Sequence, residues 1–392
     1  MIDIDFLQKQ EVVEFIQNNE NADTHQLLLN PPKEFRDKIN LIADQVSARK
    51  KAKGKLKEWV ADPALIFPPP ISIEQASSSA TADYKKSLVE GELLIDLTGG
   101  TGIDCLELSD TFKKSIYVEQ NRDLCKVFSH NQKHLGREIE IHCEDAESFL
   151  SSFHGRATFF IDPARRDTAK SKVFKLEDCT PNVLELMPEL AKKSNELLMK
   201  LSPLLDIKDS LRKISNVKEV HVVSSRNECK EVLLLLDFNS TNTPSIHAVN
   251  LGSGQQPYLF DFEKEAHSNV SFGKVSNYLF EPNASVLKAG AFKSIAADFN
   301  LQKIAPSTHL YTASSKVQAF PGRVFEIESM DGKKELAKYA PNKAINVITR
   351  NYPMQASDLK KKFRLKDGGD YFLIGFRDNQ NKPHLVITRR IQ

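Results

Sequence analysis

The sequence predicts an α/β protein built on a mostly parallel sheet, and three observations carry this prediction. Between residues 92 and 238, short apolar runs alternate with stretches of helical spacing. The runs are continuously apolar, which is typical of strands that are buried on both faces. The last two runs, KEVHVVSS and EVLLLLDF, are joined by a connection too short for a crossover helix. These two strands must therefore form an antiparallel hairpin.

The part of the chain before this pattern, residues 1–88, is predicted to be mainly helical. Apolar residues recur at helical spacing as far as Ile42, and a strongly basic run follows from Arg49 to Lys57. This run is either a solvated helix face or a patch that faces a nucleic acid. Three prolines, residues 68–70, are expected to be extended, and a short helix then leads into the first strand.

Residues 89–240 hold five strand-then-helix units, with helices expected to begin at Ile103 and Ile207 and a long loop after ATFFIDP. Residues 241–325 follow as a small domain with two short strands around a Gly-Ser-Gly turn, then a loop, a helix and two more strands. Residues 326–392 predict a strand, a helix and two strands, a small α+β module. Lysine and arginine dominate residues 333–366, as expected for a surface that meets a polyanion, although a solvated face has the same composition.

The bulk composition excludes several classes of protein. The 392 residues contain no apolar run long enough to span a membrane, and the acidic, amphipathic start MIDIDFLQKQEVVEF is unlike a secretory signal. The five cysteines lie far apart without a C-x-x-C pair, which predicts reduced, buried thiols and neither a disulfide framework nor a zinc site. We therefore expect a cytoplasmic protein without a bound metal.

The stretch LLIDLTGGTGIDCLEL runs from a strand through a glycine-rich turn into a helix, and three ligands could explain the turn. A phosphate-cradling loop requires a lysine that is missing here. A dinucleotide fingerprint matches Gly100 and Gly102 but has Cys105 in place of its third glycine. A pocket for S-adenosylmethionine fits better, because Asp96 at the strand end suits the cationic sulfonium and amino groups.

Acidic residues also end the next two strands. Glu119 stands where a ribose diol needs an acceptor, which both NAD and S-adenosylmethionine sites provide. Asp145, followed by Ala146, stands where a side chain could accept from an adenine amino group. Each acid has a purely structural alternative, since Asp96 could cap the turn and Asp145 the following helix. Their combination, with the final hairpin, favours S-adenosylmethionine.

The fourth strand ends in Asp162-Pro163-Ala164-Arg165-Arg166, which faces the same crevice in a parallel sheet. Asp162 could hold or deprotonate an acceptor there. The two arginines suit phosphate recognition, or they could pair with Glu177 and Asp178.

The motifs DLTGGTG, VEQN, EDA and DPARR resemble those of class I, Rossmann-like S-adenosylmethionine-dependent methyltransferases, across residues 90–240. This resemblance implies a seven-stranded sheet with an antiparallel final hairpin. The stretches EQASSSATADYKK, SPLLDI, NECKEVLLLL and RNYPMQASDLKKKFRLKDGGDYFLIG are similar to a bacterial methyltransferase group with a C-terminal THUMP-like domain. The segment YLFEPNASVLKAGAF looks like the small ferredoxin-like insert of that group.

The resemblance implies a methyltransferase that uses S-adenosylmethionine and acts on RNA, either tRNA or rRNA. The residues expected to bind the cofactor are Asp96, Thr98, Gly99, Gly100, Gly102, Glu119, Asp145 and Ala146. Asp162 and Pro163 would lie at the reacting centre, and Arg165 and Arg166 would bind substrate.

One departure leaves the methylated atom open. Nucleic-acid amino-methyltransferases usually continue the Asp-Pro pair with a second proline and an aromatic residue, whereas this chain has Ala164 and Arg165. The change favours an alternative, a non-catalytic RNA-binding protein on a degenerate methyltransferase fold. A nicotinamide-dependent dehydrogenase is a weaker alternative.

Overall fold

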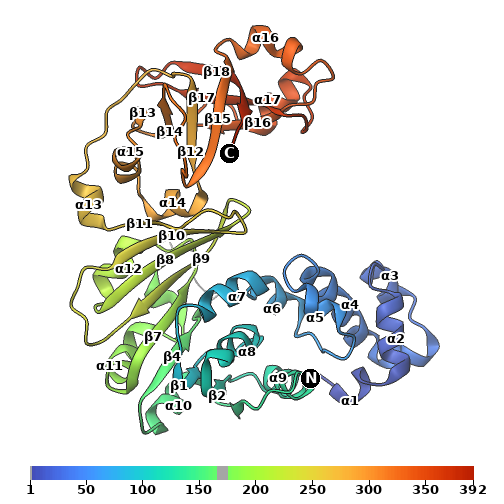
Figure 1. Ribbon diagram of the computed structural model, residues 1–392. Helices are drawn as coiled ribbons and strands as arrows, with labels where there is room; N and C mark the ends of the chain where they lie inside the picture. The colour runs from blue at the N-terminus through green and yellow to red at the C-terminus, as the bar shows by residue number, and fades with distance from the viewer. Residues whose placement is uncertain (1, 166–174) are drawn as a thin grey trace. The chain divides into compact units, whose positions relative to one another are not determined.

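The computed structural model describes residues 2–165 and 175–392, and the chain divides into two compact units. The first unit comprises Met1–Lys218 and Leu233–Asn242, and the second comprises Glu219–Val232 and Thr243–Gln392. Figure 1 traces the chain by colour from blue to red. Across the described residues, no helix is long and apolar enough to cross a membrane.

The chain begins with short helices that pack together, as the helical spacing predicts. They are α1 (Ile4–Leu7), α2 (Gln10–Asn18), α3 (Thr24–Leu29), the 3₁₀ helix η1 (Lys33–Lys38), α4 (Ile39–Ala52) and α5 (Lys57–Ala61). The apolar faces of α1 to α4 and η1 form one cluster that includes Phe6, Ile42 and, from a later helix of the same unit, Val127, whereas Trp59 of α5 packs in a separate cluster. The N-terminal helices are therefore part of the first unit's core.

The basic run is less exposed than the sequence predicts, because Arg49 is buried. Its guanidinium donates to the backbone carbonyl of Val60 in α5 and to those of Asp62, Pro63 and Leu65 in the segment that follows α5. This part of the run is thus structural, since a buried cation requires such acceptors.

Two helices lead from the proline-rich break to the sheet, α6 (Pro70–Gln75) and α7 (Ser79–Lys86). Pro70 is helical rather than extended, because proline is well suited to the first position of a helix. Ser78 and Thr81 form a capping box at the start of α7.

The sheet of the first unit is parallel, as predicted. Neighbouring strands pair in the order β3-β2-β1-β4-β7 with all four pairings parallel. These strands are β1 (Gly91–Asp96), β2 (Phe112–Val118), β3 (Glu140–His142), β4 (Ala157–Ile161) and β7 (Ser194–Leu201). The helices between them are α8 (Ile103–Leu108), α9 (Arg122–His134), α10 (Ala146–Ser152), α11 (Val183–Lys193) and α12 (Ile207–Lys213).

The starts of α8 and α12 confirm the two predicted helix starts, but the expected long loop after β4 was wrong in part. Helix α11 follows β4 and carries Pro188 in its interior, a residue that normally argues against a helix. A crossover between the parallel strands β4 and β7 nevertheless requires such an element.

The predicted antiparallel hairpin is formed by β8 (Val217–Ser225) and β9 (Glu228–Leu236), which are neighbours in the sheet. Arg226 and Asn227 have φ of 52° and 60°, as a two-residue type I′ turn requires. The sheet has nine strands rather than seven, because β10 (Ser245–Leu251) pairs parallel with β8 and β11 (Tyr258–Phe260) pairs antiparallel with β10.

The second unit also contains a separate seven-stranded sheet, in the order β13-β14-β12-β15-β18-β17-β16. Its strands are β12 (Tyr278–Pro282), β13 (Gln302–Ala305), β14 (Thr308–Ala313), β15 (Gly322–Ser329), β16 (Asn346–Arg350), β17 (Tyr371–Arg377) and β18 (Pro383–Arg390). The helices of this unit are α13 (Phe262–His267), α14 (Ala284–Ala289), α15 (Ser294–Asp298), α16 (Gly332–Tyr339) and α17 (Ala356–Phe363).

Strands β16, β17 and β18 with α17 confirm the predicted strand-helix-strand-strand order of the C-terminal part. Strand β12 extends into a stretch, from Phe280 onward, that was expected to be a loop and a helix. It pairs with β14 and β15 and so joins the segments on either side of residue 321 into one sheet.

Candidate functional site

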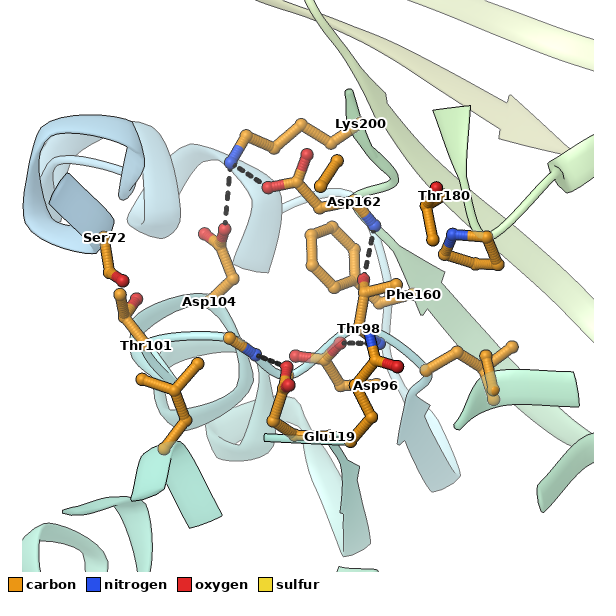
Figure 2. A pocket seen from close by; sticks show the side chains of 18 of the residues that line it. Ser72, Asp96, Thr98, Thr101, Asp104, Glu119, Phe160, Asp162, Thr180 and Lys200 are labelled. Atoms are coloured by element: carbon orange, nitrogen blue, oxygen red, sulfur yellow. Dashed lines mark hydrogen bonds and ion pairs between the residues drawn. The ribbon is translucent and has the colours of Figure 1, made fainter. Parts of the chain in front are cut away.

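A cavity of about 290 Å³ lies in the first unit, at the carboxyl ends of the parallel strands, where ligands bind in folds of this type. Asp96 ends β1, Glu119 follows β2, Asp162 follows β4 and Lys200 lies near the end of β7. Figure 2 shows these side chains arranged around one space. The residues from the sequence prediction that line it are Asp96, Thr98, Gly99, Gly100, Glu119, Asp145, Ala146 and Asp162.

The glycine turn is shaped mainly by aromatic rings beneath it. A Cβ on Gly99 would lie 2.2 Å from the Tyr117 ring, and one on Gly102 would lie 2.1 Å from the Phe128 ring. These two rings stack at 3.9 Å, and the Tyr117 hydroxyl donates to the carbonyl of Gly100 at 2.8 Å. Gly102, which does not line the cavity, is therefore required for packing.

Gly100 differs from Gly99 and Gly102 in having no side chain packed closely against it. Its φ is +53°, and an added Cβ would meet only the Thr98 carbonyl oxygen, at 3.5 Å. This residue borders the cavity, so the turn leaves its backbone accessible there.

Asp96 is buried in the site, and one of its carboxylate oxygens accepts a hydrogen bond from the backbone of the glycine turn. Oδ1 accepts from the Thr98 amide at 3.0 Å, whereas Oδ2 has no hydrogen-bond partner among the described residues. Burial raises the pKa of Asp96 well above its usual value, and the nearby acids Asp104, Asp162 and Glu119 add to this effect. Asp96 therefore caps the turn with one oxygen, and it lines the cavity with its second oxygen unpartnered among the described residues.

Glu119 is held by two backbone amides. Its Oε2 accepts from Gly100 at 2.9 Å and its Oε1 from Asn121 at 2.7 Å. Each carboxylate oxygen can accept a second hydrogen bond, so a bound hydroxyl can still be accommodated. The contact to Gly100 couples the second strand end directly to the glycine turn.

Asp145 caps a helix and also lines the cavity. It is the N-cap of α10, where Oδ1 accepts from the Ser148 amide at 2.7 Å and Oδ2 from the Ser148 hydroxyl at 3.0 Å. These hydrogen bonds lower the pKa of the Asp145 carboxyl. The exposed carboxylate and Ala146 both border the cavity.

The Asp162 segment is anchored to the glycine turn, because the Asp162 amide donates to the Thr98 hydroxyl at 2.6 Å. Ala164 lies in the short strand β5 (Ala164–Arg165), which pairs with β6 (Cys179–Thr180). Ala164 lines the cavity and Pro163 does not, while the side chain of Arg165 and the whole of Arg166 lie outside the described part of the chain. Glu177, one suggested partner of the arginines, pairs with Lys213 at 2.9 Å.

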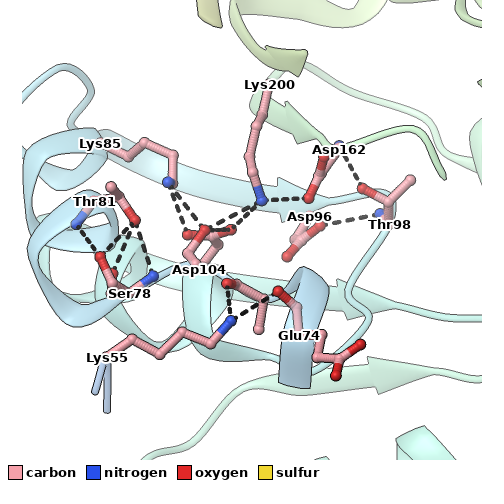
Figure 3. A network of polar contacts seen from close by, with 12 residues as sticks. Lys55, Glu74, Ser78, Thr81, Lys85, Asp96, Thr98, Asp104, Asp162 and Lys200 are labelled. Atoms are coloured by element: carbon pink, nitrogen blue, oxygen red, sulfur yellow. Dashed lines mark hydrogen bonds and ion pairs between the residues drawn. The ribbon is translucent and has the colours of Figure 1, made fainter. Parts of the chain in front are cut away.

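A buried network of charges forms one wall of the site, and the sequence reasoning missed it. Lys200 Nζ lies 2.5 Å from Asp162 Oδ2 and 3.4 Å from Asp104 Oδ2 (Figure 3). Lys85, fully buried on α7, lies 3.2 Å from Asp104 Oδ1. The Ser77 hydroxyl donates to Asp104 and accepts from both lysines.

Lys85 and Lys200 both lie within ion-pair distance of Asp104, and these two cations favour its ionised form. Burial opposes ionisation of Asp104, but Lys85 and Lys200 outweigh it, so the pKa of the carboxyl is lowered. Lys200 could have been noticed in LLMKLSP, because a lysine within an otherwise apolar buried strand requires an anionic partner.

The five cysteines are free thiols, as predicted, but they are not all buried. Cys143 is exposed and Cys229 is half-buried.

Comparison with known proteins gives the family. A ferredoxin-like domain family matches residues 278–321, and a THUMP domain-like family matches residues 322–390. A crystal structure of a protein assigned as a methyltransferase, from Porphyromonas gingivalis W83, is 30% identical over 100% of both chains with a TM-score of 0.86. No curated protein matches the sequence.

Two more distant solved structures contain S-adenosylhomocysteine. TrmK from M. capricolum is 10% identical over 41% of this chain and 69% of its own, with a TM-score of 0.33. A protein from Streptococcus mutans is 12% identical over 40% of this chain and 94% of its own, with a TM-score of 0.31. The full-length match and the THUMP-like segment together establish that the chain belongs to the family of class I, Rossmann-like methyltransferases with a C-terminal THUMP-like domain.

Proposed function

We propose that the protein is an S-adenosylmethionine-dependent methyltransferase that acts on RNA, either tRNA or rRNA. The observation that carries the cofactor assignment is the buried Asp96, which lines the cavity and whose Oδ2 lacks a hydrogen-bond partner among the described residues. A cationic ligand would supply the missing interaction and would favour the ionised carboxylate. A pyrophosphate would bring negative charge to the same place.

The other strand ends suit the rest of this cofactor. Glu119 would accept from the ribose hydroxyls and Asp145 from the adenine amino group, while Gly99 and Gly100 would border the amino-acid portion. S-adenosylmethionine supplies an activated methyl group, so the protein's task is to position the acceptor.

The acceptor side of the proposed site is the Asp162–Lys200 pair. Lys200 orients the Asp162 carboxylate at 2.5 Å, and the Thr98 hydroxyl holds the Asp162 backbone. Asp162 would then accept a hydrogen bond or a proton from the acceptor. Ala164 provides no aromatic surface for stacking a base, so the methylated atom is left to experiment.

The second unit supports RNA as the substrate class. In its THUMP-like segment, exposed basic side chains lie on or close to α17, and we call them the α17 basic surface: Lys343, Lys361, Lys362, Arg364 and Lys366. Other basic residues of this segment are neutralised in ion pairs, such as Lys360 with Asp367 and Lys334 with Asp331. A cluster of this kind provides salt-dependent affinity for a phosphate backbone. Free thiols fit a cytoplasmic site of action.

Calorimetry tests the cofactor. S-adenosylmethionine and S-adenosylhomocysteine are expected to bind to the full chain, and NAD is not. Glu119→Ala should abolish measurable binding, whereas Glu189→Ala, which alters a surface ion pair with Lys192, should not affect it. Binding of neither sulfur compound would refute the proposal, and binding of NAD alone would favour the dehydrogenase.

Methyl transfer tests the activity. The protein and tritium-labelled S-adenosylmethionine are incubated with total RNA from cells that lack the protein. Label in tRNA or rRNA is expected with the wild type and is expected to fall by about 100-fold or more in Asp162→Asn, as for loss of a general base. Cofactor and RNA binding without transfer to any acceptor would favour the non-catalytic alternative, and label in protein or small molecules would refute RNA as the substrate.

A further inference from the structure

We propose that Glu219, His221 and His247, in the second unit, form a binding site for one divalent transition-metal ion, with Zn²⁺ the preferred ion. The three side chains each offer one ligand atom, and these atoms lie within 4.8 Å of one another. The site is separate from the cavity of the first unit and is independent of the proposed methyl transfer.

The backbone places the three side chains on one face of the sheet. Glu219 and His221 are two residues apart on β8, so they point to the same side. His247 on β10 is the register partner of His221, and parallel neighbours in register share a face. The ligand set therefore comes from two adjacent strands that are fixed by backbone hydrogen bonds.

The distances suit an ion of zinc's size. One carboxylate oxygen, Glu219 Oε2, lies 3.0 Å from His221 Nε2 and 3.8 Å from His247 Nε2. Zinc binds nitrogen and oxygen at about 2.0–2.1 Å, which in a tetrahedral arrangement separates neighbouring ligands by about 3.3 Å. The two distances fall on either side of this value, and the ligand atoms of the two imidazoles lie within 4.8 Å of each other, so side-chain rotation would have to bring the imidazoles closer to an ion.

The chemistry of the ligands also fits. Two imidazoles and one carboxylate form a borderline-soft set that suits Zn²⁺ rather than Mg²⁺ or Ca²⁺. His221 is buried and the other two are half-buried, which leaves an open side for a fourth ligand such as water.

Metal binding would replace hydrogen bonds that the proposed ligands already make, including the one between His221 and Glu219. The Ser245 hydroxyl lies 2.9 Å from His247 Nε2, and this hydrogen bond would be replaced on metal binding. The two imidazole rings already face each other, with centroids 4.5 Å apart and a tilt of 32°. An ion here would connect β8 to its sheet neighbour β10, two strands that are separated in the sequence by β9.

The expectation of a metal-free protein rested on cysteine spacing. It could not detect this set, because the two histidines are distant in sequence and become neighbours only through strand pairing.

The test uses the full chain, without an affinity tag, after treatment with a chelator and removal of that chelator. Zn²⁺ alone is titrated by calorimetry and by competition with a chromophoric chelator. One equivalent is expected to bind, and His247→Ala and Glu219→Gln are each expected to weaken binding by at least about 10-fold. His384→Ala is the matched control, because His384 pairs with Asp378 elsewhere in the same unit, and its affinity should equal that of the wild type.

Two additional readouts separate coordination from misfolding. Co²⁺ should give the intense visible absorption of a four- or five-coordinate site in the wild type and in His384→Ala, and should not do so in His247→Ala. Zn²⁺ should also raise the Tm of the wild type and of the control but not that of the two ligand variants. Absence of stoichiometric binding, or equal affinity in His247→Ala and the wild type, would overturn the proposal.

Discussion

The stacked rings beneath the glycine turn predict that Gly102→Ala destabilises the first unit more than any other alanine substitution in the turn. The new Cβ would lie 2.1 Å from Cδ2 and 2.5 Å from Cε2 of Phe128, far inside contact distance. Phe128 cannot easily move away, because its ring is stacked on that of Tyr117. The φ of +79° adds a second cost, because a side chain disfavours this conformation.

The magnitudes follow from these two contributions. The left-handed conformation costs about 1–2 kcal/mol for a non-glycine residue, and overpacking costs about 1–3 kcal/mol. Gly102→Ala incurs both costs, and we expect a loss of about 2–5 kcal/mol. Gly99→Ala meets the Tyr117 ring alone, which corresponds to about 1–3 kcal/mol. Gly100→Ala has only the backbone cost, about 1–2 kcal/mol.

The single tryptophan makes the measurement specific. Trp59 packs against the cluster that contains Tyr117 and Phe128, so its fluorescence reports on this part of the first unit. With a urea m-value of about 3 kcal/mol per molar, a loss of about 3 kcal/mol lowers the unfolding midpoint by about 1 M. A midpoint for Gly102→Ala equal to or higher than that of Gly100→Ala would refute the packing argument.

Three further predictions concern the ligands and pH. Asp145→Ser keeps the cap of α10 and should preserve the Tm while weakening S-adenosylmethionine binding, whereas Asp145→Ala should also lose about 1 kcal/mol of stability; equal affinity of both variants and the wild type in calorimetry would contradict the cofactor role. Burial raises the folded pKa of Asp96, so the native state keeps a proton that the unfolded chain releases, and stability falls as the pH rises above about 3.9. The isosteric Asp96→Asn should therefore raise the Tm more at about pH 8 than at about pH 4, and a pH-independent difference would contradict this. A variant with alanine at Lys361, Lys362 and Arg364 removes three charges of the α17 basic surface. It should reduce the slope of log K against log salt concentration for RNA binding by about 2. The slope is measured by titration at several salt concentrations, with Lys192→Ala as the control.

Much of the fold was predictable because the signals are local. Continuous apolar runs indicated buried parallel strands, and the short connection near Asn227 indicated a hairpin. The glycine turn was identified correctly as a site of close approach, but its partners were not, because the rings of Tyr117 and Phe128 come from later elements. Sequence spacing does not reveal which side chains will lie beneath a turn.

The missed features share one cause, which is that they depend on packing between distant segments. Arg49 belongs to a basic run and was expected at a surface, yet it is buried against backbone carbonyls. Lys200 and Lys85 are unremarkable in sequence and become significant only because both reach Asp104. Helix α11 was hidden by Pro188, whose local tendency is overcome by the requirement for a crossover.

The discontinuous division of the chain has a consequence for how the protein can be made and dissected. The segment Glu219–Val232 is assigned to the second unit, although residues on both sides of it belong to the first. During synthesis, the first unit is therefore incomplete until Leu233–Asn242 has emerged, whereas Glu219–Val232 must await partners that are translated after it. No single cut yields both units intact. Fragments that end at residue 218 and begin at residue 243 would both lack residues 219–242, which contain part of each unit. Functional separation of the two units is thus better attempted by point substitution than by deletion.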